Sequence, residues 1–143
     1  YLSEEAFQEK FGRNLQFEDS SRGFGIDFAV ESYLDHQGLA FLDRFDALSY
    51  PYLTRVMDYF DPFVRPDALE ALQAHPVRSL VLSFDSDWRF STHHSRAIVR
   101  TLENAGLPVT FREISSTWGH DSFLLSLDDY HATIRAFLEA GRP

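Results

Sequence analysis

The sequence has no cysteine, a single lysine and a single methionine among its 143 residues. Without cysteine it has neither a disulfide framework nor thiolate chemistry, which is compatible with a cytoplasmic location. Its 13 basic residues are outnumbered by 22 acidic ones, and we find no basic face of the kind that nucleic acid requires. No apolar run approaches the roughly 18 residues of a membrane span. We therefore expect neither nucleic acid nor a membrane as a partner.

Hydrophobic residues make up 44% of the chain and aromatic residues 15%, which is far from the composition of disordered chains. The length suits one ordinary domain. The first residue is Tyr1 rather than methionine, so we expect either a processed chain or a piece of a longer one. Scattered arginines still permit a local site for an anionic substrate, because a guanidinium grips carboxylate or phosphate with two prongs.

The first half, residues 1–75, reads as a series of helices with aromatic faces. We expect helices over residues 3–11, 27–37, 39–45, 49–60 and 67–74, with a loop at 20–25 and no strand. Ser3 is the predicted cap of the first helix, and Gly38 is predicted to stop the second.

The second half changes its hydrophobic period. Residues 77–84 form a short apolar run typical of a buried parallel strand, and residues 109–114 alternate like a second strand. Between them, residues 94–105 predict a helix that ends at Gly106, and residues 127–138 predict a closing helix. Strand, helix and strand in succession predict a βαβ unit with two parallel strands and a right-handed crossover.

Ionisable residues follow both predicted strands. Asp87 lies in the loop after the first strand and His120 in the loop after the second. The carboxyl ends of parallel strands share one edge of the sheet, where ligands bind in open α/β folds. A carboxylate beside an imidazole orients the ring and stabilises its protonated form, as in a nucleophilic triad. Two alternatives stay open: Asp85 is the acid instead, or Asp87 merely caps the following helix.

The order of these residues matters, because α/β-hydrolase triads run nucleophile, acid, histidine along the chain. The nucleophile should therefore lie upstream of Asp87, yet the chain has no G-x-S-x-G sequence. We expect the nucleophile to lie outside this chain. Adjacent His93 and His94 point to different faces of a helix, so we expect no metal site.

Three groups of residues along the chain form a specific combination: Phe84-Asp85-Ser86-Asp87-Trp88-Arg89-Phe90, Gly119-His120-Asp121-Ser122-Phe123-Leu124-Leu125, and Val30-Glu31-Ser32-Tyr33-Leu34 with Arg44-Phe45-Asp46-Ala47 and Tyr59-Phe60-Asp61. Together they resemble the homoserine O-acyltransferases of the α/β-hydrolase type. The resemblance implies an α/β fold in which residues 1–75 are a helical lid and residues 76–143 are the C-terminal βαβα part of the hydrolase core.

The same resemblance implies roles for individual residues. Asp87 and His120 would be the catalytic acid and base, and Asp121 would hold the amino group of homoserine. Acyl-coenzyme A would be a co-substrate, with no cofactor and no metal. The reaction would be ping-pong acyl transfer to L-homoserine in methionine biosynthesis, carried out by a cytoplasmic homodimer that includes the remainder of the polypeptide.

Arg89 bears on the choice of acyl donor. A succinyl donor has a second carboxylate that an acetyl donor lacks, and an arginine at the mouth of the site could pair with it. The Trp88-Arg89-Phe90 sequence resembles the members of the family usually called succinyltransferases, which favours succinyl over acetyl.

Other functions remain open at this point. Another α/β-hydrolase activity, such as serine acylation or ester hydrolysis, would use the same acid and base. The chain could also be a non-catalytic module for lid formation and dimerisation, which would need neither the acid nor the base.

Overall fold

The computed structural model describes residues 2–17 and 24–141, which form two compact units. One unit contains Tyr1–Gln8 and Phe63–Pro143, and the other contains Glu9–Pro62. Most of the loop predicted at residues 20–25 lies outside the described residues. The division into units does not test the role of residues 1–75 as a lid, which stays a prediction.

The centre of the first unit is a pair of parallel strands. Strand β1 (Ser79–Phe84) pairs with β2 (Val109–Ile114) in register from Ser79 opposite Val109 to Phe84 opposite Ile114. Helix α5 (Thr92–Asn104) connects them. The predicted parallel βαβ unit is thus confirmed as a mixed helix and strand fold with a small parallel sheet. Strand β1 begins two residues later than predicted.

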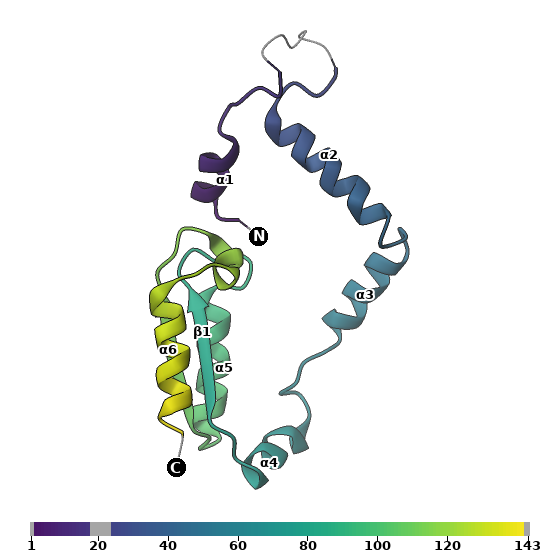
Figure 1. Ribbon diagram of the computed structural model, residues 1–143. Helices are drawn as coiled ribbons and strands as arrows, with labels where there is room; N and C mark the ends of the chain where they lie inside the picture. Colours follow the sequence, from purple (N-terminus) through teal and green to yellow (C-terminus); the bar gives the residue numbers. More distant parts are fainter. Residues whose placement is uncertain (1, 18–23, 142–143) are drawn as a thin grey trace. The chain divides into compact units, whose positions relative to one another are not determined.

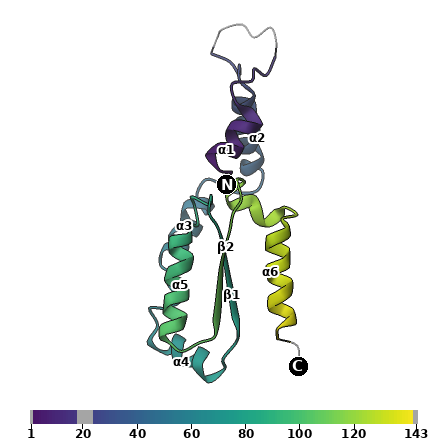
Figure 2. The same cartoon turned by 90° about the vertical axis from the view of Figure 1, so that its left-hand side faces the viewer.

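Helices cover both faces of this pair, with α5 on one side and α6 (Asp128–Glu139) on the other (Figures 1 and 2). On the α5 side, Val99 and Leu102 are buried. On the α6 side, the Tyr130 ring lies 5.6 Å from the ring of Phe84. Ile114, only 2% exposed, completes the centre of the core. The strands therefore have apolar contacts above and below, as parallel strands require.

The turn from α5 into β2 is a glycine cap, as the sequence predicts. Gly106 has a φ of 70°, which few residues other than glycine adopt. The N–H of Leu107 donates to the carbonyl of Leu102 at 3.0 Å, and the N–H of Gly106 donates to Glu103 at 2.9 Å. These bonds satisfy the last carbonyls of α5 and direct Leu107 into the core.

Two further α-helices of the first unit precede β1 in the sequence. Helix α1 (Glu4–Phe11), which continues into the second unit, begins after Ser3, whose hydroxyl accepts the Ala6 N–H at 3.1 Å. The predicted Ser3 cap is confirmed. Helix α4 (Pro66–Ala74) is joined to the end of α5 by Gln73, whose side-chain amide donates to the Ala105 carbonyl at 2.6 Å.

The second unit contains α2 (Ala29–Leu42) and α3 (Ser49–Asp58). The prediction that Gly38 stops a helix is wrong, because α2 continues through it to Leu42. A helix interior tolerates glycine at a cost of about 1 kcal/mol, and the apolar pattern resumes directly after it. The separate helix expected at residues 39–45 is therefore mostly the last turn of α2. Leu15 and Phe28 also form an isolated antiparallel bridge.

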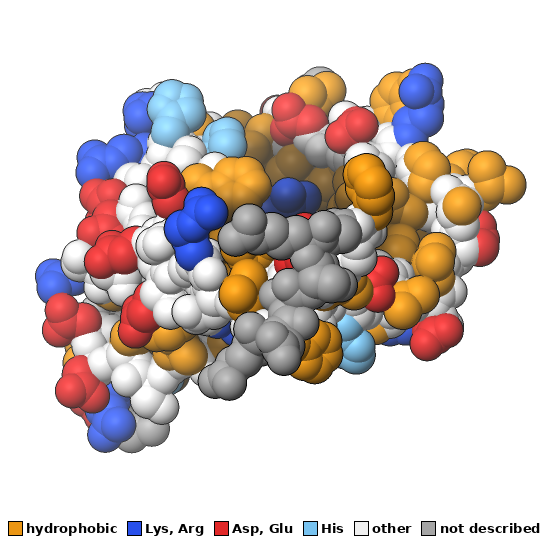
Figure 3. Space-filling model, turned by 90° about the horizontal axis from the view of Figure 1, so that it is seen from above, with side chains coloured by type: hydrophobic (Ala, Val, Ile, Leu, Met, Phe, Trp, Pro, Cys, Tyr) orange, Lys and Arg blue, Asp and Glu red, His pale blue; other side chains and the backbone are white. Residues whose placement is uncertain are grey.

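Apolar side chains remain exposed on both helices of the second unit. Neither α2 nor α3 has a buried residue, and Leu34, Tyr52 and Met57 are each more than half exposed. Hydrophobic side chains reach the surface over much of the face seen in Figure 3. Within residues 2–17 and 24–141, no helix is both long and apolar enough to cross a membrane.

Candidate active site

The loops that follow β1 and β2 bring Asp87 and His120 together. The Nδ1 atom of His120 lies 2.8 Å from Oδ2 of Asp87. Asp87 is 5% exposed, and the imidazole is only partly exposed. Since both strands end at the same edge of the sheet, residues 33 positions apart in sequence meet there. The contact predicted from the sequence is therefore confirmed.

The backbone of its own loop holds the second oxygen of Asp87. The N–H groups of Arg89 and Phe90 donate to Oδ1 at 3.1 and 2.9 Å. The carboxylate thus presents one oxygen to its loop and the other to the imidazole. The N-cap residue of helix α5 is Ser91. The alternative that Asp87 merely caps this helix is therefore wrong.

Burial and hydrogen bonding act in opposite directions on the pKa of Asp87. Burial raises this pKa, but the Phe90 N–H, the hydrogen bond and charge of His120, and the Arg89 N–H together lower it by more. The pKa therefore lies below the ordinary aspartate value, and Asp87 is ionised at neutral pH. An ionised Asp87 can only accept, so His120 donates from Nδ1 and the neutral ring carries its lone pair on Nε2. That tautomer is the one a general base requires.

Two phenylalanine rings lie beside the imidazole. The rings of Phe90 and Phe123 have centroids 4.7 and 5.2 Å from that of His120. Asp87 and His120 also line a groove of about 290 Å³ that extends along β1, where Leu80, Leu82 and Tyr130 are among its walls. Asp87 and His120 therefore face a largely apolar space in which electrostatic interactions are stronger than in water.

Asp85, the competing acid, has a different partner. Its Oδ1 accepts the N–H of Ser116 at 3.0 Å. This bond, followed by one from the Ser115 hydroxyl, lowers the pKa of Asp85 against a smaller opposing effect of burial. Asp85 thus joins the two loops, whereas Asp87 is the carboxylate on the imidazole.

Serine hydroxyls link the same two loops, a feature that the sequence reasoning missed. The Ser86 hydroxyl donates to the Ser116 carbonyl and accepts the N–H of Gly119 at 3.0 Å. Ser122 is fully buried. Its hydroxyl donates to the Gly119 carbonyl at 2.6 Å, and its Oγ atom lies 2.8 Å from the Oγ atom of Ser116. The only signal in the sequence is that serine occurs in both segments that follow the strands, at Ser86 and at Ser115, Ser116 and Ser122.

The segment carrying His120 also has an unusual backbone. Gly119 is buried and has a φ of 64°, and it opens a 3-10 helix, η1 (Gly119–Leu124), that no pattern in the sequence predicts. A side chain at this φ would be strained. The glycine therefore allows the chain to turn so that the next residue, His120, faces Asp87.

The other predicted site residues lie in the same two loops. Asp121 follows His120 in η1 and is partly buried, while Arg89 lies two residues after Asp87 and is exposed. Their roles as substrate contacts stay predictions. His93 and His94 have ring centroids 6.0 Å apart at the start of α5. Across the described residues, no group of three or more histidine or acidic side chains could hold a metal ion.

The segment before α1 is attached to both loops. The indole N–H of Trp88 donates to the Leu2 carbonyl at 3.2 Å, and the Ser3 hydroxyl donates to the carbonyl of Thr117. A pocket of about 600 Å³ lies between this segment and the loop after β1, with Phe7 and Ser86 among its lining residues. Residues 2–8 therefore border the candidate site.

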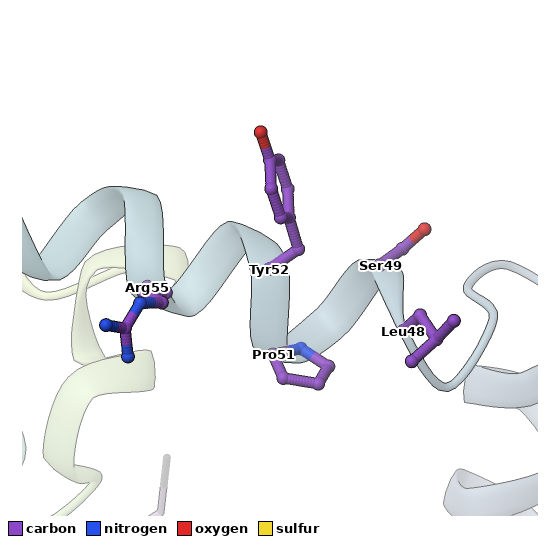
Figure 4. A pocket seen from close by; sticks show the side chains of 5 residues that line it. All are labelled: Leu48, Ser49, Pro51, Tyr52 and Arg55. Atoms are coloured by element: carbon purple, nitrogen blue, oxygen red, sulfur yellow. The ribbon is translucent and has the colours of Figure 1, made fainter.

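A further hollow lies within the second unit. It has a volume of about 540 Å³ and is formed by the start of α3, from which its lining side chains project (Figure 4): Leu48, Ser49, Pro51, Tyr52 and Arg55. Its lining is mostly apolar with a single cation. It contains none of the residues predicted for catalysis.

Comparison with known proteins adds to this geometry. No family model matches the chain. The homoserine O-acetyltransferase of Rhodospirillum rubrum is 51% identical over 142 residues, which cover 97% of this chain and 36% of that protein. The homoserine O-succinyltransferase of Magnetococcus marinus is also 51% identical over 142 residues, with 96% and 36% covered. That of Nocardioides is 46% identical over 138 residues, with 96% and 37% covered.

These relatives carry two names that differ only in the acyl group transferred. Relatives of both names are 51% identical to this chain, so overall similarity does not separate acetyl from succinyl transfer. The chain spans little more than a third of the length of these proteins. Along nearly all of its own length, it is homologous to the homoserine O-acetyltransferases and O-succinyltransferases.

Proposed function

We propose that the complete protein containing this chain acylates the side-chain hydroxyl of L-homoserine, with an acyl-coenzyme A as donor. The observation that carries the proposal is the contact between Asp87 and His120 at the carboxyl edge of two parallel strands. The names of the homologous proteins supply the substrate. The whole fold is proposed to be an α/β-hydrolase, in which the two strands belong to a larger sheet.

The reaction is proposed to proceed through an acyl-enzyme. A serine outside this chain attacks the thioester carbonyl while Nε2 of His120 takes its proton. The carbon–sulfur bond breaks, and the coenzyme A thiolate leaves with the proton returned by His120. The homoserine hydroxyl then loses its proton to His120 and attacks the ester. The serine oxygen departs and recovers the proton, which leaves O-acyl-homoserine and the enzyme unchanged.

Asp87 has a supporting part in each step. Its carboxylate keeps the proton of the neutral ring on Nδ1 and stabilises the imidazolium when Nε2 is protonated. The Phe90 and Arg89 N–H groups keep this carboxylate ionised and fixed in place. The rings of Phe90 and Phe123 beside the imidazole would limit the access of water, which competes with homoserine for the acyl-enzyme.

Asp121 and Arg89 are proposed as substrate contacts. The carboxylate of Asp121, beside the general base, would bind the ammonium group of homoserine. The exposed guanidinium of Arg89 would pair with the distal carboxylate of a succinyl donor, so succinyl is somewhat favoured over acetyl. The same proposal includes a cytoplasmic homodimer acting in methionine biosynthesis, with residues 1–75 as a lid and no cofactor.

The test uses the complete protein with either succinyl- or acetyl-coenzyme A and with homoserine, serine or water as acceptor. We expect O-acyl-homoserine and free coenzyme A thiol in equal amounts, with homoserine strongly preferred. Acylation of serine, or hydrolysis alone, would instead support the other hydrolase activities. The 143-residue chain by itself should be inactive. Turnover by this chain would contradict the hypothesis that the nucleophile lies outside it.

Arg89→Ala tests the choice of donor separately. We expect the ratio of kcat/KM for succinyl over acetyl donor to fall by about tenfold, the effect of losing one charge-assisted pair. Arg65→Ala is a matched control, since Arg65 is exposed and its carboxylate partner, Asp67, lies outside the site. An unchanged ratio would remove Arg89 from donor recognition.

A further inference from the structure

Three consecutive residues after β1 each contact the loop that carries His120. Asp85 accepts the backbone N–H of Ser116 at 3.0 Å, and Asp87 contacts the His120 ring at 2.8 Å. Between them, Ser86 donates to the Ser116 carbonyl and accepts the Gly119 N–H at 3.0 Å. The two loops are therefore joined residue by residue, and the last contact in the series is the acid and base pair.

Ser86 has a central place in this series because its one hydroxyl binds the second loop at two points. Those points, Ser116 and Gly119, bracket the turn that precedes His120. Gly119 is buried, so its N–H has no ready alternative acceptor in solvent if the Ser86 hydroxyl is removed. Gly119 has a positive φ, which turns the chain directly before His120. The orientation of His120 therefore depends on how the peptide group of Gly119 is held.

Ser122 braces the same turn from inside the second loop. It is fully buried, and its hydroxyl reaches both the Gly119 carbonyl at 2.6 Å and the Ser116 hydroxyl at 2.8 Å. The peptide groups on both sides of Gly119 are thus held by serine side chains from two different loops. Both serines bond the backbone of Gly119, so both act on the imidazole through the backbone.

We propose that Ser86, supported by Ser122, is a positioning residue that sets the placement of the His120 imidazole against the Asp87 carboxylate. Its effect on the reaction rests on the proposed function, but its effect on the imidazole does not. A displacement of about 1 Å at a reacting group lowers a rate by up to about a hundredfold. Loss of the Ser86 hydroxyl should therefore slow the chemical steps without weakening substrate binding.

The experiment compares Ser86→Ala with Ser86→Thr in the complete protein. Ser86→Ala should lower kcat by about tenfold or more and leave KM for both substrates within about twofold, because only orientation is lost. Ser86→Thr keeps the hydroxyl on a residue that lines a pocket, so kcat should largely recover. Ser126→Ala, an exposed serine of the adjoining segment, is the matched control and should have no effect.

A second readout does not depend on activity. The His120 Nδ1 proton, bonded to Asp87, should give a downfield proton resonance that Ser86→Ala shifts or broadens and Ser126→Ala leaves in place. If the unsubstituted protein acylates no homoserine yet Ser86→Ala changes this resonance, the proposed function fails and the positioning role stands. An unchanged resonance, or an unchanged kcat in an active protein, would overturn the positioning role.

If the Ser86→Ala protein does not fold, a second variant tests the positioning role. Ser122→Ala removes the supporting hydroxyl from the other loop, and the same loss of kcat and change in resonance are expected from it in smaller degree. Circular dichroism of each variant separates loss of fold from loss of orientation. A folded Ser122→Ala protein with normal kcat and a normal resonance would overturn the proposal.

Discussion

The two units of this chain use their apolar residues in different ways. Around β1 and β2, side chains from α5 and the strands pack into a small core, with Val99, Leu102 and Ile114 buried. In Glu9–Pro62, the described helices α2 and α3 have no buried residue, although they are rich in leucine and aromatic side chains. The first region thus has a core of its own, whereas the apolar faces of α2 and α3 stay exposed.

The largest expected effect tests whether chemistry belongs to the region with the core. Asp87→Asn in the complete protein should lower kcat by about a thousandfold or more, because an amide cannot hold the required imidazole tautomer. Asp85→Asn serves as the matched control and should cost much less, since Asp85 contacts the Ser116 backbone rather than the ring. Steady-state kinetics of both variants decide the matter, and equal losses would contradict the assignment of Asp87 as the acid.

The next effect compares a buried apolar residue of the first region with an exposed apolar residue of the second. Ile114→Ala should lower the free energy of unfolding of the complete protein by about 2–4 kcal/mol, because it leaves a cavity at a site that is 2% exposed. Leu34→Ala, at a site 56% exposed, should cost less than about 1 kcal/mol. Urea unfolding measures both values. A large loss for Leu34→Ala would show that the rest of the polypeptide covers this side of α2.

A pair of glycines gives a smaller contrast of opposite sign. Gly119→Ala should destabilise the protein by about 1–2 kcal/mol, since its φ of 64° is strained for alanine. Gly38→Ala should stabilise it by about 0.5–1 kcal/mol, because the site lies inside α2 and an added Cβ has no atom within 4 Å. Thermal unfolding of the two variants provides the measurement. Destabilisation by Gly38→Ala would reveal a close neighbour in the complete protein.

The smallest expected effect concerns pH. Folding lowers the pKa of Asp87, so its contribution to stability is fully present above the ordinary aspartate pKa of about 3.9. That contribution is lost as pH falls through the lower pKa of the folded chain. Urea unfolding between pH 7 and pH 3 should therefore show a smaller acid-induced loss for Asp87→Asn than for the unsubstituted protein. An identical loss in both would contradict the lowered pKa.

The sequence was enough to predict the central geometry for physical reasons. An apolar run identifies β1 and an alternating pattern identifies β2. Parallel strands necessarily end at one edge, which brings Asp87 to His120. The serine contacts were not predictable, because a hydroxyl has several equivalent partners in a loop and only the folded backbone selects one. Gly38 misled the prediction because local propensity opposes a helix there while the apolar pattern on both sides continues it.

Asp87 and His120 lie on one uninterrupted stretch of chain, 33 residues apart, in the two loops that follow the strands of one βαβ unit. Their relative placement is therefore inherited as a unit. Genetic recombination, circular permutation or grafting that keeps residues 79–122 together would transfer Asp87, His120 and the serines that join their loops in one step. The serine nucleophile that we propose has no such linkage to this segment. A redesign of the site can thus keep residues 79–122 unchanged and vary the nucleophile that is combined with them.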